Sequence, residues 1–474
     1  MRCGRRLPCQ ASISVTAKPN ISASPASAGI RWKSMRSEGV WITPRQNGGS
    51  DRILIDAGRC VTMMRGMIRH AIAAAALFAP LAPLAAQDVA KNAGPPPAAV
   101  VVSFDRDSID PLIVEGLANK ETGRALEAND PVRIASISKL IMSLTALRLM
   151  DEGKVDLERD VSEYLGWQLR SPNHPEAPVT LKHLLTHRAG LSDKAGYIIP
   201  LGESLEAKLA DPAAWRDTGF PGVATFEYAN LGSPVVATVL EAASGERYDR
   251  LVERLVFKPL GVKACLNWTL CDAGMQARAV TLYRDTGEPA RDAPADLPPA
   301  CTIPVAEGAP CDLDGYVPGT NASIFSPQGG VRIGMMDLAR IGQELQRWAS
   351  SDFLSANALG LWWGEMFAAS AQHTPGERVA DFCAYGLAAY ALDNEAPCVD
   401  ELINDGNARI GHGGEAYGMR SGLWMSFTNP PAPSYAYFTT EVPPPPGGED
   451  TGGVDPREVA LLARAQALSN KVKP

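Results

Sequence analysis

The chain has 474 residues, with 45 basic and 53 acidic side chains and a formal net charge of −8 at pH 7. Residues 1–86 hold 12 of the basic and 3 of the acidic side chains, so residues 87–474 carry 33 against 50, a net charge of −17. A surface this acidic disfavours nucleic acids and anionic membranes as partners. The 388 residues from 87 onward are enough to bury a large hydrophobic core.

Residues 64–86 have the composition of a secretory signal peptide. A basic start, Met64-Arg-Gly-Met-Ile-Arg-His70, leads into a short apolar run that ends in small residues at Ala86. The run is too short for a comfortable membrane span, and no cysteine directly follows Ala86. We therefore expect a periplasmic or secreted protein without a stable membrane anchor. Residues 1–63, polar and rich in Ser and Arg, are interpreted as a leader outside the mature protein, with a disordered tail as the alternative.

Residues 87–474 show the pattern of a mixed α/β (α+β) fold. Two pairs of β-rich runs, one pair near each end of this region, predict antiparallel strands at 99–104, 111–116, 423–427 and 434–440. Apolar residues at helical spacing predict helices between these pairs at 136–152, 180–186, 231–244, 247–256 and 336–349. A hairpin at 278–287 and a last helix at 456–471, beside the N-terminal strands, complete the pattern. We expect one domain over 87–474, with a mainly helical subdomain at roughly 140–380 inserted between strands of the sheet.

The helix predicted from residue 136 begins with Ser136 and Lys139, which are three residues apart. On a helix this spacing puts both side chains on one face, with the serine near the positive end of the helix dipole. A hydroxyl is a weak nucleophile at neutral pH, and a lysine within reach can activate it by accepting its proton. Such a pair alone would more often be a helix cap and a solvated lysine. Two further motifs in the chain favour the chemical interpretation.

The second motif is Tyr228-Ala-Asn230, just before a predicted helix. An ammonium close to Tyr228 favours the phenolate, whereas burial favours a neutral Lys139, so either group is a candidate acceptor for the serine proton. Asn230 points the same way as the tyrosine if the segment is extended. Its amide can then hold either the lysine or an amide of a substrate.

The third motif lies in the glycine-rich stretch 411–422, which precedes the apolar run 423–427. Glycines let a substrate lie close against the backbone of a strand. We expect His412 and Gly414 to line a substrate site. The backbone N–H of Glu415 is a candidate partner for that of Ser136 in an oxyanion hole.

Six cysteines of residues 87–474 form three close pairs, which are Cys265 with Cys271, Cys301 with Cys311 and Cys383 with Cys398. Their short separations favour three local disulfides, and disulfides agree with an oxidising periplasm. Reduced, buried thiols are the alternative.

Other reaction classes find little support. The chain has no Gly-x-Ser-x-Gly elbow, no His-Glu-x-x-His and no glycine-rich nucleotide loop before a helix, and its six histidines have no zinc-ligand spacing. We interpret His183 and His187 as structural residues, one inside a short helix and one shaping the turn before Gly190. We expect neither a metal nor a cofactor.

The three motifs, in this order, resemble the serine β-lactamase and penicillin-binding-protein-like superfamily, specifically the branch of class C β-lactamases, esterase B and D-aminopeptidases. The likeness runs from about residue 97 to about residue 442 and includes 180–191, 232–262 and 326–330. It implies a β-lactamase/transpeptidase-like fold, an antiparallel sheet flanked by helices with a mainly helical subdomain, in a single catalytic domain. The resemblance also implies that Ser136 is the acylated nucleophile and that Lys139 and Tyr228 transfer protons. Asn230 would be a positioning residue.

One motif departs from the class C pattern. His412-Gly-Gly414 stands where class C β-lactamases usually have Lys-Thr-Gly, a variant common among the esterases and peptidases of the family. Lysine is a fixed cation at pH 7, whereas an ordinary imidazole is mostly neutral, so His412 is a poor ligand for a substrate carboxylate. Arg420 would supply the charge if the strand runs unbroken, although Gly418 allows a bulge.

These features predict a secreted serine hydrolase that cleaves ester or amide bonds of a small-molecule or peptide substrate, of the esterase or D-amino-acid peptidase type. A β-lactamase or D-Ala-D-Ala carboxypeptidase is the alternative within this class. A non-catalytic sensor or binding module with the same fold is the alternative outside it.

Overall fold

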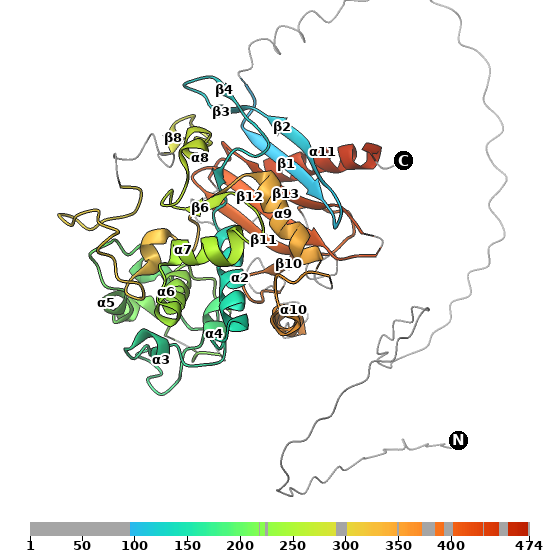
Figure 1. Cartoon of the computed structure of the whole chain (residues 1–474). Coiled ribbons are helices and arrows are strands. Elements are labelled where there is room, and N and C mark those ends of the chain that lie inside the picture. Colours follow the sequence, from blue (N-terminus) through green and yellow to red (C-terminus); the bar gives the residue numbers. More distant parts are fainter. Residues whose placement is uncertain are drawn as a thin grey trace, which may run out of the picture. The chain divides into compact units, whose positions relative to one another are not determined.

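The computed structural model describes residues 95–217, 219–222, 226–290, 301–347, 350–371, 384–392, 402–429, 431–444 and 454–472. All of them belong to one structural unit, residues 82–474. Its main sheet is antiparallel, with the strand order β10-β11-β12-β13-β1-β2 (Figure 1). These strands are β1 Ala99–Phe104, β2 Ile109–Glu115, β10 Tyr390–Leu392, β11 Arg409–Ala416, β12 Met419–Ser426 and β13 Ser434–Thr439.

Both predicted strand pairs are present, as β1 with β2 and β12 with β13, and they join where β1 pairs with β13. Strand β1 is buried on both faces, which explains its continuous apolar sequence. Val100, Val102 and Phe104 face the larger core, whereas Ala99 and Val101 face a smaller core under helix α11 (Pro456–Val472). The last helix therefore packs beside the N-terminal strands, as predicted.

The opposite face of the sheet is covered by α9, Met335–Gln346. A Cβ at Gly342 would lie 2.5 Å from the ring of Phe104, so only glycine allows this close packing of α9 on β1.

The helices between the strand pairs are α2 Ile137–Asp151, α3 Ser162–Leu165, α4 Leu181–Leu185, α5 Leu205–Leu209, α6 Gly232–Ser244, α7 Tyr248–Val252, α8 Ala273–Ala277 and α10 Ala356–Ala371. Short turns of 3₁₀ or π geometry add η1 Asp193–Ala195, η2 Pro212–Ala214, η3 Glu253–Phe257 and η5 Ala322–Phe325. Every predicted helix is present, and its ends differ from the predicted ones by no more than a few residues. Helix α10 was not predicted, because its apolar residues lie on all sides and show no helical stripe.

The remaining strands are two or three residues long. They are β3 Leu117–Asn119, β4 Arg124–Ala125, β5 Val132–Arg133, β6 Ala264–Leu266, β7 Leu282–Tyr283, β8 Pro289–Ala290 and β9 Val331–Ile333. Strands β7 and β8 form the hairpin predicted at 278–287, shifted toward its C-terminal end. The pairing of β5 and β6 with β9 brings the residues before α2 next to the segment around Gly330.

Helix α2 is buried almost all round, and it contacts α6 and α7 as well as β11 and β12 (Figure 1). It begins after Ser136 and ends at Asp151, close to the predicted bounds 136–152, and Gly153 follows in the left-handed region at φ 69°. The buried position holds its first turn firmly against the sheet. Among the described residues, none of the helices has the length and apolarity that a membrane span needs.

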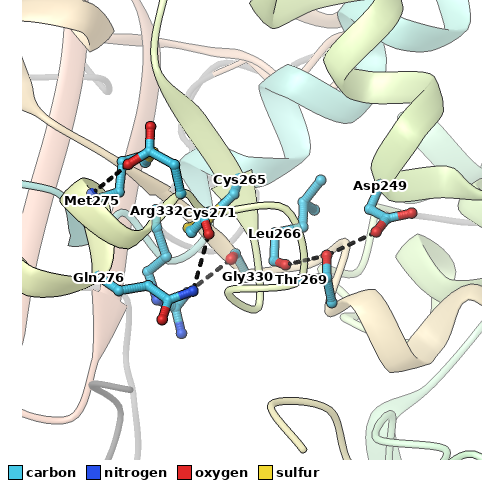
Figure 2. The surroundings of a disulfide bond; sticks show 10 residues. Asp249, Cys265, Leu266, Thr269, Cys271, Met275, Gln276, Gly330 and Arg332 are labelled. Atoms are coloured by element: carbon cyan, nitrogen blue, oxygen red, sulfur yellow. Dashed lines mark hydrogen bonds between the residues drawn. A yellow bond between two sulfur atoms is a disulfide. The ribbon is translucent and has the colours of Figure 1, made fainter. Parts of the chain in front are cut away.

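Two of the three predicted disulfides are present, Cys265–Cys271 and Cys301–Cys311, and the third pair lies outside the described residues. Figure 2 shows the first, in a turn that Thr269 ties to Asp249 through a hydrogen bond of 2.8 Å from its hydroxyl. The guanidinium of Arg332 lies over the ring of Trp268, a residue of this turn, at 5.2 Å from the ring centre.

Peptide mapping without reduction should recover both links, and the predicted link Cys383–Cys398, after export to an oxidising compartment. Replacing both cysteines of the second pair with serine should lower the free energy of unfolding by about 3 kcal/mol, and replacing the first pair by about 2 kcal/mol, because its closed loop is shorter. Urea unfolding measures both values, with the reduced wild type as control. Free thiols at these positions would contradict the prediction.

Candidate active site

Ser136 stands at the N-cap of α2, after a sharp turn out of β5. The preceding residue, Ala135, has φ 45°, in the left-handed region that a side chain disfavours. Such strain persists only where the surroundings enforce it, and it is concentrated at functional sites. Within the described residues the backbone N–H of Ser136 has no acceptor, as expected at the first turn of a helix.

The ammonium group of Lys139 is the centre of the site. Its side chain is 1% exposed, and its Nζ donates to Ser136 Oγ at 3.1 Å, Asn230 Oδ1 at 2.8 Å and the carbonyl oxygen of Gln328 at 3.1 Å. Nζ also lies 4.7 Å from the centre of the Tyr228 ring, over its face. The structure therefore brings together the four residues that the first two motifs contribute.

Burial lowers the pKa of Lys139 from 10.5 to about 7, although the negative charge of Asp193 acts in the opposite direction. A neutral amine has two hydrogens and a lone pair, so Nζ can then donate only two of these hydrogen bonds and must accept the third. Ser136 is the partner that carries a proton to donate. The geometry therefore allows the hydroxyl to hydrogen-bond to a neutral Lys139 close to physiological pH.

Asn230 lies between Lys139 and Asp193. Asp193 was not among the site residues predicted from the sequence. The carboxylate of Asp193 accepts hydrogen bonds from the backbone N–H of Asn230 at 2.9 Å, from its Nδ2 at 3.0 Å, and from the backbone N–H of Leu231 at 2.9 Å. Of the two roles left open for Asn230, the amide oxygen takes the first, because it holds the lysine. The only sequence signal at Asp193 is the cap-like Ser192-Asp193 pair, which does not point to Asn230.

His412 is buried and lies in a chain of three polar rings. Its Nε2 is 3.0 Å from Tyr385 Oη, which is 3.2 Å from His187 Nε2. His187 Nδ1 accepts from the backbone N–H of Ala229 at 3.1 Å, and His412 Nδ1 lies 2.5 Å from the carbonyl oxygen of Gly413. The protons can therefore take one assignment, in which His187 donates to Tyr385, Tyr385 donates to His412 and His412 donates to the carbonyl.

Both imidazoles are neutral at pH 7. Burial, and secondarily the charge of Lys139, lowers the pKa of His412 from 6.5 to about 3. Burial also places the pKa of His187 well below 6.5. His187 has φ 55° in the turn after α4, and its ring stacks on Tyr228 with 4.4 Å between centres, so this structural residue supports the site directly. His183 belongs to the capping box of α4, which confirms its structural interpretation.

Arg420 does not supply the cation that His412 lacks. The strand is not unbroken, because Tyr417 and Gly418 both have positive φ and form the hairpin turn between β11 and β12. Arg420 is therefore paired with Glu415, and Nη2 lies 2.7 Å from the carboxylate. Side chains alternate between the two faces of a strand, so this ion pair lies on the face opposite to His412.

Gly414 lies against the turn that precedes Ser136. A Cβ at this position would stand 2.3 Å from the carbonyl oxygen of Ile134 and 3.2 Å from Cβ of Ala135. The backbone N–H of Gly413 donates to Tyr390 Oη at 3.1 Å on the β10 side of β11. Amides two residues apart point to the same edge of a strand, so that of Glu415 also points to the β10 side of β11.

The family model described as Beta-lactamase matches residues 86–453, and the chain belongs to this family. Esterase EstB of Burkholderia gladioli is 31% identical over 170 residues, which cover 32% of this chain and 42% of that protein. The D-alanyl-D-alanine-carboxypeptidase/endopeptidase AmpH of Escherichia coli (strain K12) is 31% identical over 140 residues, which cover 28% of this chain and 35% of that protein. The chain thus matches less than half the length of these curated relatives.

Solved structures confirm the predicted β-lactamase/transpeptidase-like fold. The D-amino acid amidase from Ochrobactrum anthropi SV3 superposes with a TM-score of 0.53 at 17% identity, covering 82% of this chain and 97% of that one. D-alanine carboxypeptidase AmpC from Burkholderia cenocepacia gives a TM-score of 0.52 at 16% identity, covering 80% and 94%. Together with the family match over residues 86–453, this fold confirms the resemblance inferred from the three motifs at the level of the superfamily.

Proposed function

We propose that the chain is a serine hydrolase that cleaves ester or amide bonds through an acyl-serine intermediate on Ser136. The observation that carries this proposal is the hydrogen bond of 3.1 Å between Ser136 Oγ and the buried nitrogen of Lys139. A binding module has no need of a lysine whose pKa is lowered to about 7 beside a serine at a helix N-terminus. We further propose that the protein acts in the periplasm or outside the cell.

In the first step the lone pair of Lys139 accepts the hydroxyl proton while Ser136 Oγ bonds to the substrate carbonyl carbon. The carbonyl electron pair moves to oxygen, where the backbone N–H of Ser136 and that of Glu415 would stabilise the charge. The intermediate collapses, and the leaving alcohol or amine takes a proton from Lys139 or through Tyr228. Water then attacks the acyl group by the same route, which releases the acid and restores Ser136.

The substrates that this site favours lack a carboxylate next to the cleaved bond. His412 is neutral and its Nε2 accepts from Tyr385, while Arg420 lies on the other face of the sheet. We therefore propose short-chain acyl esters as substrates, with D-amino-acid peptides as the second candidate and slow or absent turnover of β-lactams. The name of one relative, an esterase, agrees with the first of these substrate classes.

A fluorophosphonate probe followed by intact-mass measurement tests the proposal. The wild type should gain one adduct, and Ser136→Ala should gain none, while Ser138→Ala, a buried serine two residues away, should still react. An unlabelled wild type would favour the non-catalytic binding module. A panel of p-nitrophenyl esters, nitrocefin and D-Ala-D-Ala peptides then separates the substrate classes, and efficient nitrocefin hydrolysis would favour a β-lactamase.

The acylation rate should rise with pH. Because the neutral amine of Lys139 is the reactive form and its pKa lies at about 7, kcat/KM for an ester should increase through pH 7 and level off about one to two units above it. His412, with a pKa of about 3, does not titrate in this range. Initial rates between pH 5.5 and pH 9 measure the profile, with circular dichroism at each pH as the control for folding. A profile that is flat across pH 7 would exclude this lysine as the base.

A further inference from the structure

Asp193 lies at the beginning of η1 and clamps the segment that leads from Tyr228 into α6. Three hydrogen bonds of 2.9 to 3.0 Å reach its carboxylate, two from Asn230 and one from the backbone of Leu231. Leu231 is the N-cap residue of α6, and its own side chain makes no capping hydrogen bond. Asp193 therefore supplies, from a distant turn, the acceptors that the beginning of this helix needs.

The clamp also decides which way the Asn230 amide faces. A carboxylate only accepts hydrogen bonds, so it takes the NH₂ end of the amide and leaves the oxygen toward Lys139, at 2.8 Å. The reverse orientation would put two donors, NH₂ and the lysine nitrogen, against each other, and two oxygens against each other at Asp193. The orientation of Asn230 thus depends on Asp193.

We infer that Asp193 is a positioning residue of the active site, which orients Asn230 toward Lys139 and places a negative charge that favours the protonated lysine. This inference rests on the proposed function. Lys139 also faces Tyr228, His187 and His412, of which the two histidines are neutral. Asp193 is the acidic group that acts on the lysine, and its charge opposes the effect of burial on the pKa of Lys139.

The two effects separate in Asp193→Asn. Loss of the charge should move the rising limb of the pH profile to lower pH, and loss of the clamp should lower the plateau of kcat by about ten- to a hundredfold with little change in KM. In an Asn230→Ala background, Asp193→Asn should no longer lower the plateau, while the shift of the limb should remain. Asp193→Glu, which keeps the negative charge, should return the rising limb of the pH profile to its wild-type position. Asp211→Asn, at the N-cap of the neighbouring η2, is the matched control and should change neither.

A measurement that needs no turnover distinguishes this inference from the proposed function. In protein labelled with ¹³C at lysine Cε, the signal that disappears in Lys139→Arg reports the titration of Lys139. Its midpoint should fall in folded Asp193→Asn and stay unchanged in Asp211→Asn, whether or not the wild type hydrolyses any substrate. An unchanged midpoint in Asp193→Asn would overturn the inference. If that variant does not fold, Asp193→Ser removes the same charge and tests the same point, and an unchanged midpoint in it would likewise overturn the inference.

Discussion

Lys139→Ala and Tyr228→Phe should each lower kcat/KM for an ester substrate by about a hundredfold or more, as the loss of a general base usually does. The double variant should lose far less than the product of the two single losses. The physical reason is the contact between the groups, because Nζ lies over the tyrosine ring at 4.7 Å from its centre. Two groups this close act as a unit in proton transfer, and removing either one already disables it.

The measurement is a double-mutant cycle on kcat/KM at a pH above 8, where the wild-type lysine is mostly neutral. Tyr164→Phe is the control for the loss of a phenol hydroxyl, since this hydroxyl accepts a hydrogen bond from the backbone N–H of Asp156 on the surface. Near-wild-type folding by circular dichroism is required of each variant. Losses that multiply would show that the lysine and the tyrosine contribute independently, contrary to the mechanism proposed.

The short-range part of this site was predictable. Ser136 and Lys139 are brought together by one helical turn, and the geometry of a helix is the same in every protein. Tyr228 and Asn230 joined them through the order of the motifs and the resemblance to the family. In the structure Lys139 contacts Ser136, Tyr228 and Asn230.

Contacts between distant segments were not predictable in the same way. Asp193 binds Asn230 across 37 positions of the sequence, and no periodicity or spacing marks such a pair. His187 was recognised as the shaper of a turn, but its stacking on Tyr228 follows only from the packing of the turn after α4 against that loop. Both residues act by orienting others, which a motif search does not reveal.

The expectation for Arg420 failed for a reason of strand geometry. Counting eight residues from His412 preserves the face only along one continuous strand, and the turn at Tyr417 and Gly418 reverses the chain within that interval. The glycine-rich stretch 411–422 has no apolar alternation that would mark the reversal. Helix α10 was missed because its sequence has no apolar stripe, and the shortest strands because they are only two or three residues long. The longer runs of β1 and α11 were found.

Gly414→Ala should abolish hydrolysis, with a loss of at least about a hundredfold in kcat/KM. The added Cβ would stand 2.3 Å from the carbonyl oxygen of Ile134, a backbone atom that cannot move aside alone. Relief requires β11 to separate from the turn that holds Ala135 in its strained conformation and Ser136 at the beginning of α2. The hydroxyl and the edge of β11 would then no longer face the same carbonyl group.

The same substitution at Gly364 is the matched control, because a Cβ there meets nothing within 4 Å in the middle of α10. Gly364→Ala should keep full activity and gain up to about 1 kcal/mol of stability from helix propensity. The rate of fluorophosphonate labelling on Ser136 distinguishes a displaced nucleophile from lost substrate binding, and thermal unfolding shows whether the fold survives. Wild-type labelling in a folded Gly414→Ala variant would mean that β11 does not position the nucleophile, and the geometry proposed for the oxyanion hole would be wrong.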